Sequence, residues 1–199
     1  GTMTNQDSSD LVYSSVLPDQ SFLTGVNSSY GFGSFDGTND IVTASAVNKD
    51  YKSFSVWVKQ TSTITKSSGG EPIGSFFTGG FGVIWIGEFS SADTDELITL
   101  YDGTRTTWEN AGSASFPNDS WTHLALVWDG SKYQIYYNGQ PQTTTTNATH
   151  VPLKDNQSSF IGRGGASRSE FFDGDISGVA LWNKSLSASE VSAIYTAGR

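Results

Sequence analysis

The sequence of 199 residues contains no cysteine. That absence excludes disulfide bonds, zinc sites built from thiolates and cysteine nucleophiles. It leaves the compartment open, because secreted and cytosolic proteins alike can lack cysteine. The chain also lacks an apolar run of the eighteen or so residues that a membrane span needs, so we expect no membrane insertion.

Basic residues are few and scattered. Lys and Arg number 11 against 20 Asp and Glu, which gives a formal net charge of −9. Phosphate backbones and anionic headgroups are repelled by such a chain, and we expect no nucleic-acid partner. The acidity serves solubility or supplies oxygen ligands to a hard cation.

The chain also has little that favours helices. It has one methionine and no long tracts of Ala, Glu, Lys and Leu, whereas aromatic residues make up 13%. Aromatic and branched side chains suit a pleated sheet, which predicts an all-β fold. Residues 1–10 have no apolar periodicity, and we read them as a tag remnant or flexible end before a single domain over residues 11–199.

Residues 121–140 predict a β-hairpin. In the first run Leu124 and Leu126 alternate with Ala125 and Val127, so both faces carry apolar groups, as in a strand inside a sheet. A turn at Asp-Gly separates this run from YQIYY, and the return run ends at Asn-Gly, which suits two consecutive positive φ angles.

Other strand-length runs recur at short intervals. SFSVWVKQ predicts a half-buried strand, and YGFGSF followed by DGTND and IVT predicts a second hairpin. Near the end, Ser187 and Glu190 form a capping box that predicts one short helix. About a dozen strands without a βαβ rhythm predict two antiparallel sheets packed face to face.

The order of these motifs resembles a known family. FDGTNDIV, SFSVWVK, WTHLALVWDGSKYQIYYNG, IGR and FFDGDISGVALWNKSLSASEVSAIY follow one another as in the laminin-G-like jelly rolls of the concanavalin A-like lectin/glucanase superfamily. The last segment also looks like the pentraxins. The resemblance covers roughly residues 30–197. It implies a jelly roll that binds glycans or proteins or, in the enzymes, cleaves polysaccharides, and many relatives hold Ca²⁺ at rim loops.

Fold alone does not choose among these functions. The glucanases of the superfamily usually carry alternating acids on one strand, E-x-D-x-E, and that pattern is missing here. Glu88 stands alone as the acid of a weak glycanase, which is the least favoured reading. We therefore expect a binding module and not an enzyme.

Two groups of oxygen-bearing side chains are candidates for Ca²⁺. Such a site needs six to eight oxygens from flexible loops. The competing interpretation is that these acids cap turns, as at Asp36-Gly37 and Asp173-Gly174. The candidate metal ligands are Asp93, Asp95 and Glu96 in one loop and Asp36, Asn39 and Asp40 in the other.

Trp108 is the leading candidate for glycan contact, because sugar faces stack on aromatic rings while hydroxyls bond to polar neighbours. We expect it in an irregular loop over residues 105–112. The alternative is that it folds back over the core. The candidate ligand-binding residues are Asp102, Arg105, Trp108, Glu109 and Asn110, with Arg163, Arg168 and Glu170 from a second loop.

These features predict a non-catalytic, lectin-like carbohydrate-binding module, extracellular or at a cell surface or virion, from an adhesin, a secreted enzyme or a virus particle. Ca²⁺ is its candidate cofactor, and no organic cofactor is expected. The alternative is a structural or protein-interaction module of a virion or cell surface, with a surface protein as partner. The sequence leaves the sugar and the oligomeric state open.

Overall fold

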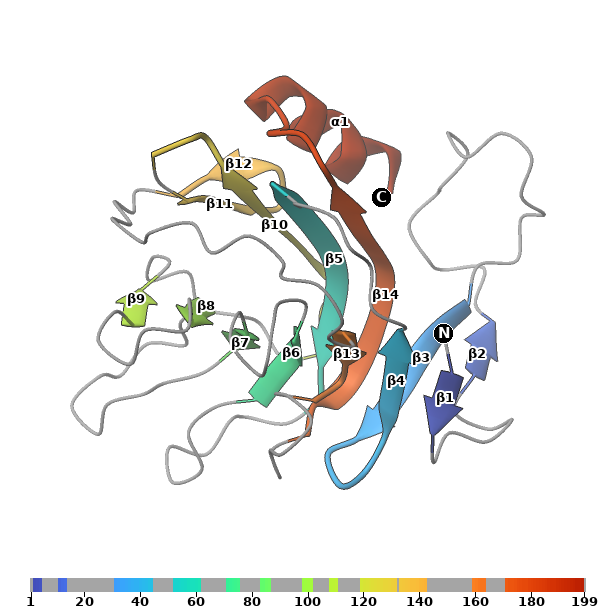
Figure 1. Ribbon diagram of the computed structural model, residues 1–199. Coiled ribbons are helices and arrows are strands. Elements are labelled where there is room, and N and C mark those ends of the chain that lie inside the picture. The colour runs from blue at the N-terminus through green and yellow to red at the C-terminus, as the bar shows by residue number, and fades with distance from the viewer. Residues whose placement is uncertain are drawn as a thin grey trace.

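The structure is a computed structural model of the chain. It describes residues 2–4, 11–13, 31–44, 52–61, 71–75, 83–86, 98–101, 108–110, 119–131, 133–142, 159–163 and 171–198. Within these residues it contains two antiparallel sheets of seven strands each and one helix (Figure 1). The expected all-β sandwich with a short C-terminal helix is confirmed.

The first sheet, sheet A, follows the order β1-β4-β13-β6-β7-β8-β9. Its β6 and β7 pair antiparallel. The strands are β1 Thr2–Thr4, β4 Ile41–Ala44, β13 Ser159–Ile161, β6 Glu71–Ser75, β7 Val83–Ile86, β8 Ile98–Tyr101 and β9 Trp108–Asn110.

The second sheet, sheet B, follows the order β12-β11-β10-β5-β14-β3-β2. The β10–β11 hairpin predicted over residues 121–140 lies in it, with β10 in the interior of the sheet as expected. The strands are β12 Gln140–Pro141, β11 Tyr133–Tyr137, β10 Thr122–Trp128, β5 Ser53–Gln60, β14 Asp173–Trp182, β3 Gly31–Asp36 and β2 Leu11–Tyr13.

The Asn-Gly turn at the end of the return strand is as predicted. Asn138 and Gly139 have φ angles of 49° and 74°, the left-handed conformation that this dipeptide tolerates. The Asn138 amide N–H donates to the His123 carbonyl at 2.8 Å, and its side-chain Oδ1 accepts from the His123 N–H at 3.0 Å. The Asn138-Gly139 turn, which joins β11 to β12, therefore also ties the end of β11 to β10.

The hydrophobic core lies on the inner face of sheet B. Phe54, Val56 and Val58 of β5 pack there beside Leu124 and Leu126 of β10. Burial of each such side chain stabilises the fold by about 1.5–3 kcal/mol. Alternation in these two strands therefore predicted the inward-facing residues correctly.

A helix forms a third layer on the outer face of sheet B. Helix α1 spans Ala188–Ala197 and lies over β10 and β11, on the side opposite to β6–β9 (Figure 1). Its Val191 is fully buried and packs near Ala125 and Val127. The outer face of β5 is covered as well, with Trp57 only 6% exposed. The expectation of a half-buried strand is therefore wrong, because the helix covers the second face.

The second predicted hairpin is also wrong. Strand β3 belongs to sheet B and β4 to sheet A, so the two strands do not pair with each other. The turn over residues 36–40 instead carries the chain from one sheet to the other. Turn residues between two strand-like runs predict a reversal of direction, and they do not say which partner each strand takes.

Two further segments differ from expectation. Thr2–Thr4 form β1 and pair with β4, whereas we expected no regular structure in residues 1–10. Trp108–Asn110 form β9 and pair with β8, so an irregular loop is wrong for these three residues. In β9 the polar Glu109 and Asn110 follow Trp108, so a strand of three residues gives almost no alternation to detect.

Candidate functional site

The turn over residues 36–40 is held by its own acidic side chains. Asp36 Oδ1 accepts from the backbone N–H groups of Thr38 at 2.8 Å and Asn39 at 3.3 Å. Asp40 Oδ2 accepts from the Asp36 N–H at 2.9 Å, and Gly37 adopts a left-handed φ of 71°. Aspartate at the first position and glycine at the second suit such a turn.

The start of β14 lies against this turn. The Gly37 N–H donates to the Phe172 carbonyl at 3.0 Å, and Asp36 is the register partner of Asp173. Phe172 is fully buried in the core, so the neighbouring Asp173 points to the outer face beside Asp36. Thr61 follows β5 and donates its hydroxyl to Asp173 Oδ1 at 2.7 Å.

An arginine and a phenylalanine complete the surface. Arg163 follows β13 and forms an isolated antiparallel bridge with Phe171. Its guanidinium lies 5.3 Å from the centre of the Phe171 ring, in cation–π contact. Because Phe171 and Asp173 flank the inward-facing Phe172, both lie on the outer face. We call Asp36, Thr61, Arg163, Phe171 and Asp173 together the turn surface.

The turn surface offers the groups that recognise a polyhydroxylated ligand. Asp36 and Thr61 are exposed, and Arg163, Phe171 and Asp173 are partly exposed. Carboxylates accept hydrogen bonds from hydroxyl groups, and a guanidinium donates them. The surface therefore combines acceptors, donors and an aromatic ring where β3, the start of β14 and the residue after β13 meet.

Of the predicted calcium ligands, Asp36, Asn39 and Asp40 lie in the described turn. Two of their carboxylate oxygens already accept backbone hydrogen bonds, as turn-capping residues do. In the part of the chain that the structure describes, no group of three His, Asp or Glu side chains could hold a metal ion. The other predicted ligands, Asp93, Asp95 and Glu96, lie outside the described residues.

The predicted glycan-binding residues that the structure describes lie at two separate places in sheet A. Trp108, Glu109 and Asn110 lie in β9, at one edge of sheet A, whereas Arg163 follows β13, four strands away. At about 4.8 Å between strands the separation is roughly 19 Å. The others lie outside the described residues: Asp102, Arg105, Arg168 and Glu170.

Three residues of the turn surface escaped the sequence analysis. Asp173 was considered only as a turn residue, yet it is the first residue of β14. Phe171 and Thr61 were not among the candidate ligand-binding residues. Alternation in FFDGDI carried a signal, because a buried Phe172 places Phe171 on the outer face. No sequence signal places Arg163 over that ring.

Two further sequence predictions concern catalysis and membrane insertion. Glu88, the acid considered for a glycanase, lies outside the described residues. Within the described residues, no helix has both the length and the apolar character required to cross a membrane.

Comparison of the structure with solved structures finds the same fold in proteins of low identity. Domain 4 of AbnA, a GH43 extracellular arabinanase from Geobacillus stearothermophilus in complex with arabinotriose, aligns with a TM-score of 0.67 and 18% identity, over 98% of this chain and 87% of that chain. A heptameric SAP-like pentraxin from Limulus polyphemus aligns with a TM-score of 0.57 and 18% identity, over 81% and 80%. These identities show the fold alone.

A sialidase from Trypanosoma rangeli also aligns, with a TM-score of 0.58 and 14% identity, over 83% of this chain but only 27% of the sialidase chain. The search of curated protein sequences gave no significant match. The family model Laminin_G_3 matches residues 19–192, nearly the whole chain. The chain therefore belongs to the concanavalin A-like lectin/glucanases superfamily, as the order of its motifs indicated.

Proposed function

We propose that this domain is a non-catalytic carbohydrate-binding module that binds its glycan at the turn surface. The observation that carries the proposal is the cation–π contact of Arg163 with Phe171 beside the register pair of Asp36 and Asp173. A sugar packs a C–H face on an aromatic ring and exchanges hydrogen bonds with carboxylate and guanidinium groups. These three kinds of group lie where β3, the start of β14 and the residue after β13 meet.

One similar structure supports the proposal by its ligand. The AbnA domain aligns over almost all of this chain and was solved with arabinotriose. That domain belongs to an extracellular enzyme. We propose that this domain likewise acts outside the cell, attached to an adhesin, a secreted enzyme or a virus particle.

Ca²⁺ near Asp36, Asn39 and Asp40 is the finer part of the proposal. Two oxygens of the turn are engaged with backbone N–H groups, and carboxylates retain further lone pairs for an ion. In this proposal the ion orders the turn and adds direct contacts to sugar hydroxyls.

The test is a glycan array probed with the purified chain, once with Ca²⁺ and once with excess chelator. The proposal predicts binding to a defined group of glycans in at least one condition. It is rejected if no glycan binds in either, at protein concentrations high enough to detect weak lectins. A stable oligomer in size-exclusion chromatography, with a melting temperature indifferent to sugars, favours the alternative protein-interaction module.

A further inference from the structure

The C-terminal half of α1 is held against sheet B by three rings. Tyr195 of α1 stacks on Trp57 of β5, with ring centres 5.7 Å apart and planes 22° apart. His123 of β10 contacts both, at 5.2 Å from Trp57 and 6.0 Å from Tyr195. We call these three residues the aromatic cluster. Such ring pairs stabilise a fold by more than the burial of their apolar area alone accounts for.

Two glycines close the aromatic cluster. A Cβ atom added at Gly198, which caps α1, would lie 2.7 Å from Nε1 of Trp57. One added at Gly139 would lie 2.9 Å from the ring of Tyr195. Real Cβ atoms do not approach other atoms so closely. The rings therefore pack directly on the backbone and leave little room for rearrangement.

His123 has no exposed surface. Neither of its ring nitrogens has a hydrogen-bond partner among the described residues. A neutral imidazole tolerates this environment better than an imidazolium, which carries two N–H donors and a charge. Burial accordingly lowers the pKa of His123 from 6.5 to about 4.

The groups around His123 offer little compensation for a positive charge. Asn138, which follows β11, accepts a hydrogen bond from the His123 backbone N–H through its Oδ1, and Tyr136 of β11 carries no charge in acid. On β14, Ser177 is neutral, and Asp175 forms an ion pair with Lys59 of β5 at 2.7 Å. The ion pair lies on the same face of the sheet, two residues along from the register pair of Ser177 and Trp57, and it adds no net charge.

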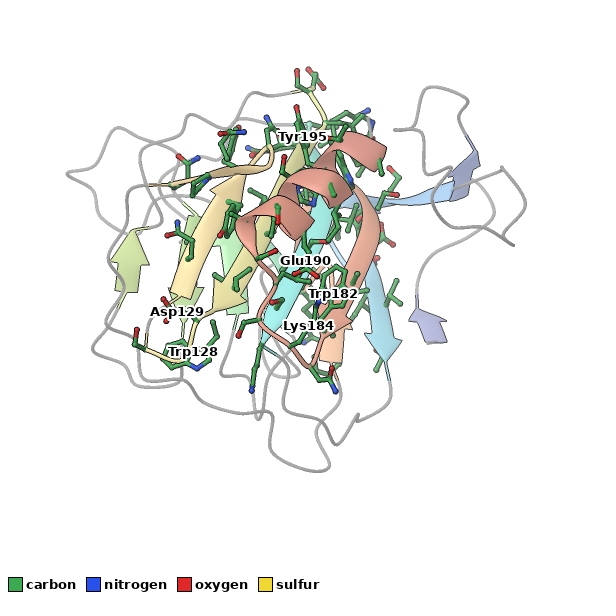
Figure 2. The ribbon with its side chains drawn as sticks, turned by 90° about the horizontal axis from the view of Figure 1, so that it is seen from above. Trp128, Asp129, Trp182, Lys184, Glu190 and Tyr195 are labelled. Carbon is green, nitrogen blue, oxygen red and sulfur yellow. The ribbon has the colours of Figure 1, made fainter. Side chains whose placement is uncertain are left out.

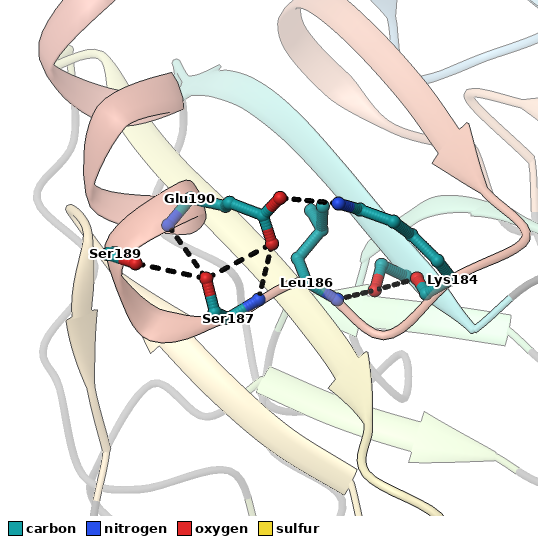
Figure 3. Close-up of polar contacts among 6 residues, drawn as sticks. Lys184, Leu186, Ser187, Ser189 and Glu190 are labelled. Atoms are coloured by element: carbon teal, nitrogen blue, oxygen red, sulfur yellow. Dashed lines mark hydrogen bonds and ion pairs between the residues drawn. The ribbon is translucent and has the colours of Figure 1, made fainter.

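The N-terminal end of α1 is held by different chemistry. The Ser187 hydroxyl accepts from the Glu190 N–H, and the Glu190 carboxylate accepts from the Ser187 N–H at 2.8 Å (Figure 3). Lys184 pairs with the same carboxylate, and Ser53 of β5 bonds to both Lys184 and Leu186. Chiefly through the hydrogen bond from Lys184, the pKa of Glu190 falls from 4.5 to about 2.

We propose that α1 is an acid-released strap, in which protonation of His123 lifts the C-terminal half of the helix from sheet B. The capping box at Ser187 and Glu190 keeps the N-terminal end attached. Figure 2 shows Tyr195 and the pair of Lys184 and Glu190 at opposite ends of the helix, so one end can open while the other holds. Release uncovers Trp57 and His123.

The sign of the pH effect follows from the two pKa values. His123 binds a proton more readily once the strap is open, so opening becomes more favourable as pH falls from about 6.5 to about 4. The open population rises about tenfold for each pH unit in that window. Glu190 loses its contribution only as pH falls from 4.5 toward 2. Between pH 6.5 and 4.5 the C-terminal end is therefore weakened alone.

The experiment is hydrogen exchange of backbone amides from pH 7 to pH 4.5, corrected for intrinsic exchange rates. In the wild type, protection of residues 192–198 falls about tenfold per pH unit, while protection of β10 stays constant. In His123→Phe, which keeps an uncharged ring, protection of α1 stays flat. His150→Phe removes the other of the two histidines and behaves as the wild type.

Three results overturn the proposal. One is protection of α1 in the wild type that does not depend on pH. Another is loss of protection in α1 and β10 together, which indicates unfolding of the whole domain. The third is a His123→Phe variant that follows the wild type. If His123→Phe does not fold, the wild-type comparison of α1 with β10 still decides, and His123→Leu replaces it as the variant that cannot titrate.

Discussion

The turn surface and the aromatic cluster use similar residues in opposite ways. Trp57, His123 and Tyr195 contact one another and are buried or largely buried, so their rings contribute packing. Phe171 is partly exposed, and its contact is the Arg163 guanidinium. The difference teaches that an aromatic residue on the outer face of this sheet supports the fold where a helix covers it and can support binding where none does.

The largest expected effect contrasts these two regions directly. Trp57→Ala removes a buried ring between β5 and α1 and should lower the free energy of unfolding by about 3–5 kcal/mol. Phe171→Ala, on the turn surface, should cost about 1 kcal/mol or less because its ring already contacts solvent. Denaturant unfolding of both variants measures the difference. Equal losses would contradict the comparison.

The next effect tests whether the backbone beneath the turn surface is packed as tightly as the core. A Cβ atom at Gly162 would lie 2.3 Å from the Phe35 ring, and the backbone φ of Gly162 is 81°. Gly162→Ala should therefore cost about 3 kcal/mol, from overpacking and a left-handed backbone. Gly130→Ala is the matched control, because it has a positive φ and nothing within 4 Å. If Gly130→Ala loses as much stability as Gly162→Ala, backbone strain alone explains the loss, and tight packing against Phe35 does not contribute.

Calcium provides the third test of the turn surface. An ion that binds only the folded state stabilises it by about 2.7 kcal/mol when its concentration is a hundred times Kd. If Ca²⁺ binds near Asp36, thermal melts in excess chelator should show a lower melting temperature, and Asp36→Asn should abolish the difference. If chelator does not change the melting temperature, the result counts against calcium binding. The glycan proposal is then decided by its own test.

The smallest effect concerns the anchored end of α1. Ser187→Ala removes the side-chain acceptor of the capping box and should cost about 1 kcal/mol. Ser192→Ala, the same substitution within α1, should be neutral or slightly stabilising because alanine favours helix interiors. Urea midpoints of the two variants give the comparison. If Ser187→Ala does not lower stability, the capping box does not hold the N-terminal end of α1. The proposed strap would then lose the attachment on which it depends.

Local patterns predicted much of this fold. Alternation placed Leu124 and Leu126 in the core, and the Ser187–Glu190 spacing placed the start of α1. Partner choice was not local. Nothing in residues 31–44 says that β3 and β4 join different sheets, and nothing in β5 says that a helix from the end of the chain covers Trp57.

The candidate site was predicted in pieces for the same reason. From the sequence, Asp36 and Arg163 belong to separate candidate sites with separate roles. They lie at one end of the sandwich because β3, β14 and the bridge after β13 meet there. Phe171 and Asp173 join them through the pleat of β14, which the sequence shows only once the direction of Phe172 is known.

The central claim is that the turn surface binds glycan, and the most direct measurement is calorimetric titration of an array-selected glycan into matched variants. Arg163→Ala removes a charged hydrogen-bond donor and should weaken binding about tenfold or more. Lys184→Ala removes another cation, beyond the opposite end of β14 and beside α1, and should leave affinity within about twofold of the wild type. Unchanged affinity in Arg163→Ala, or an equal loss in both variants, would contradict the claim.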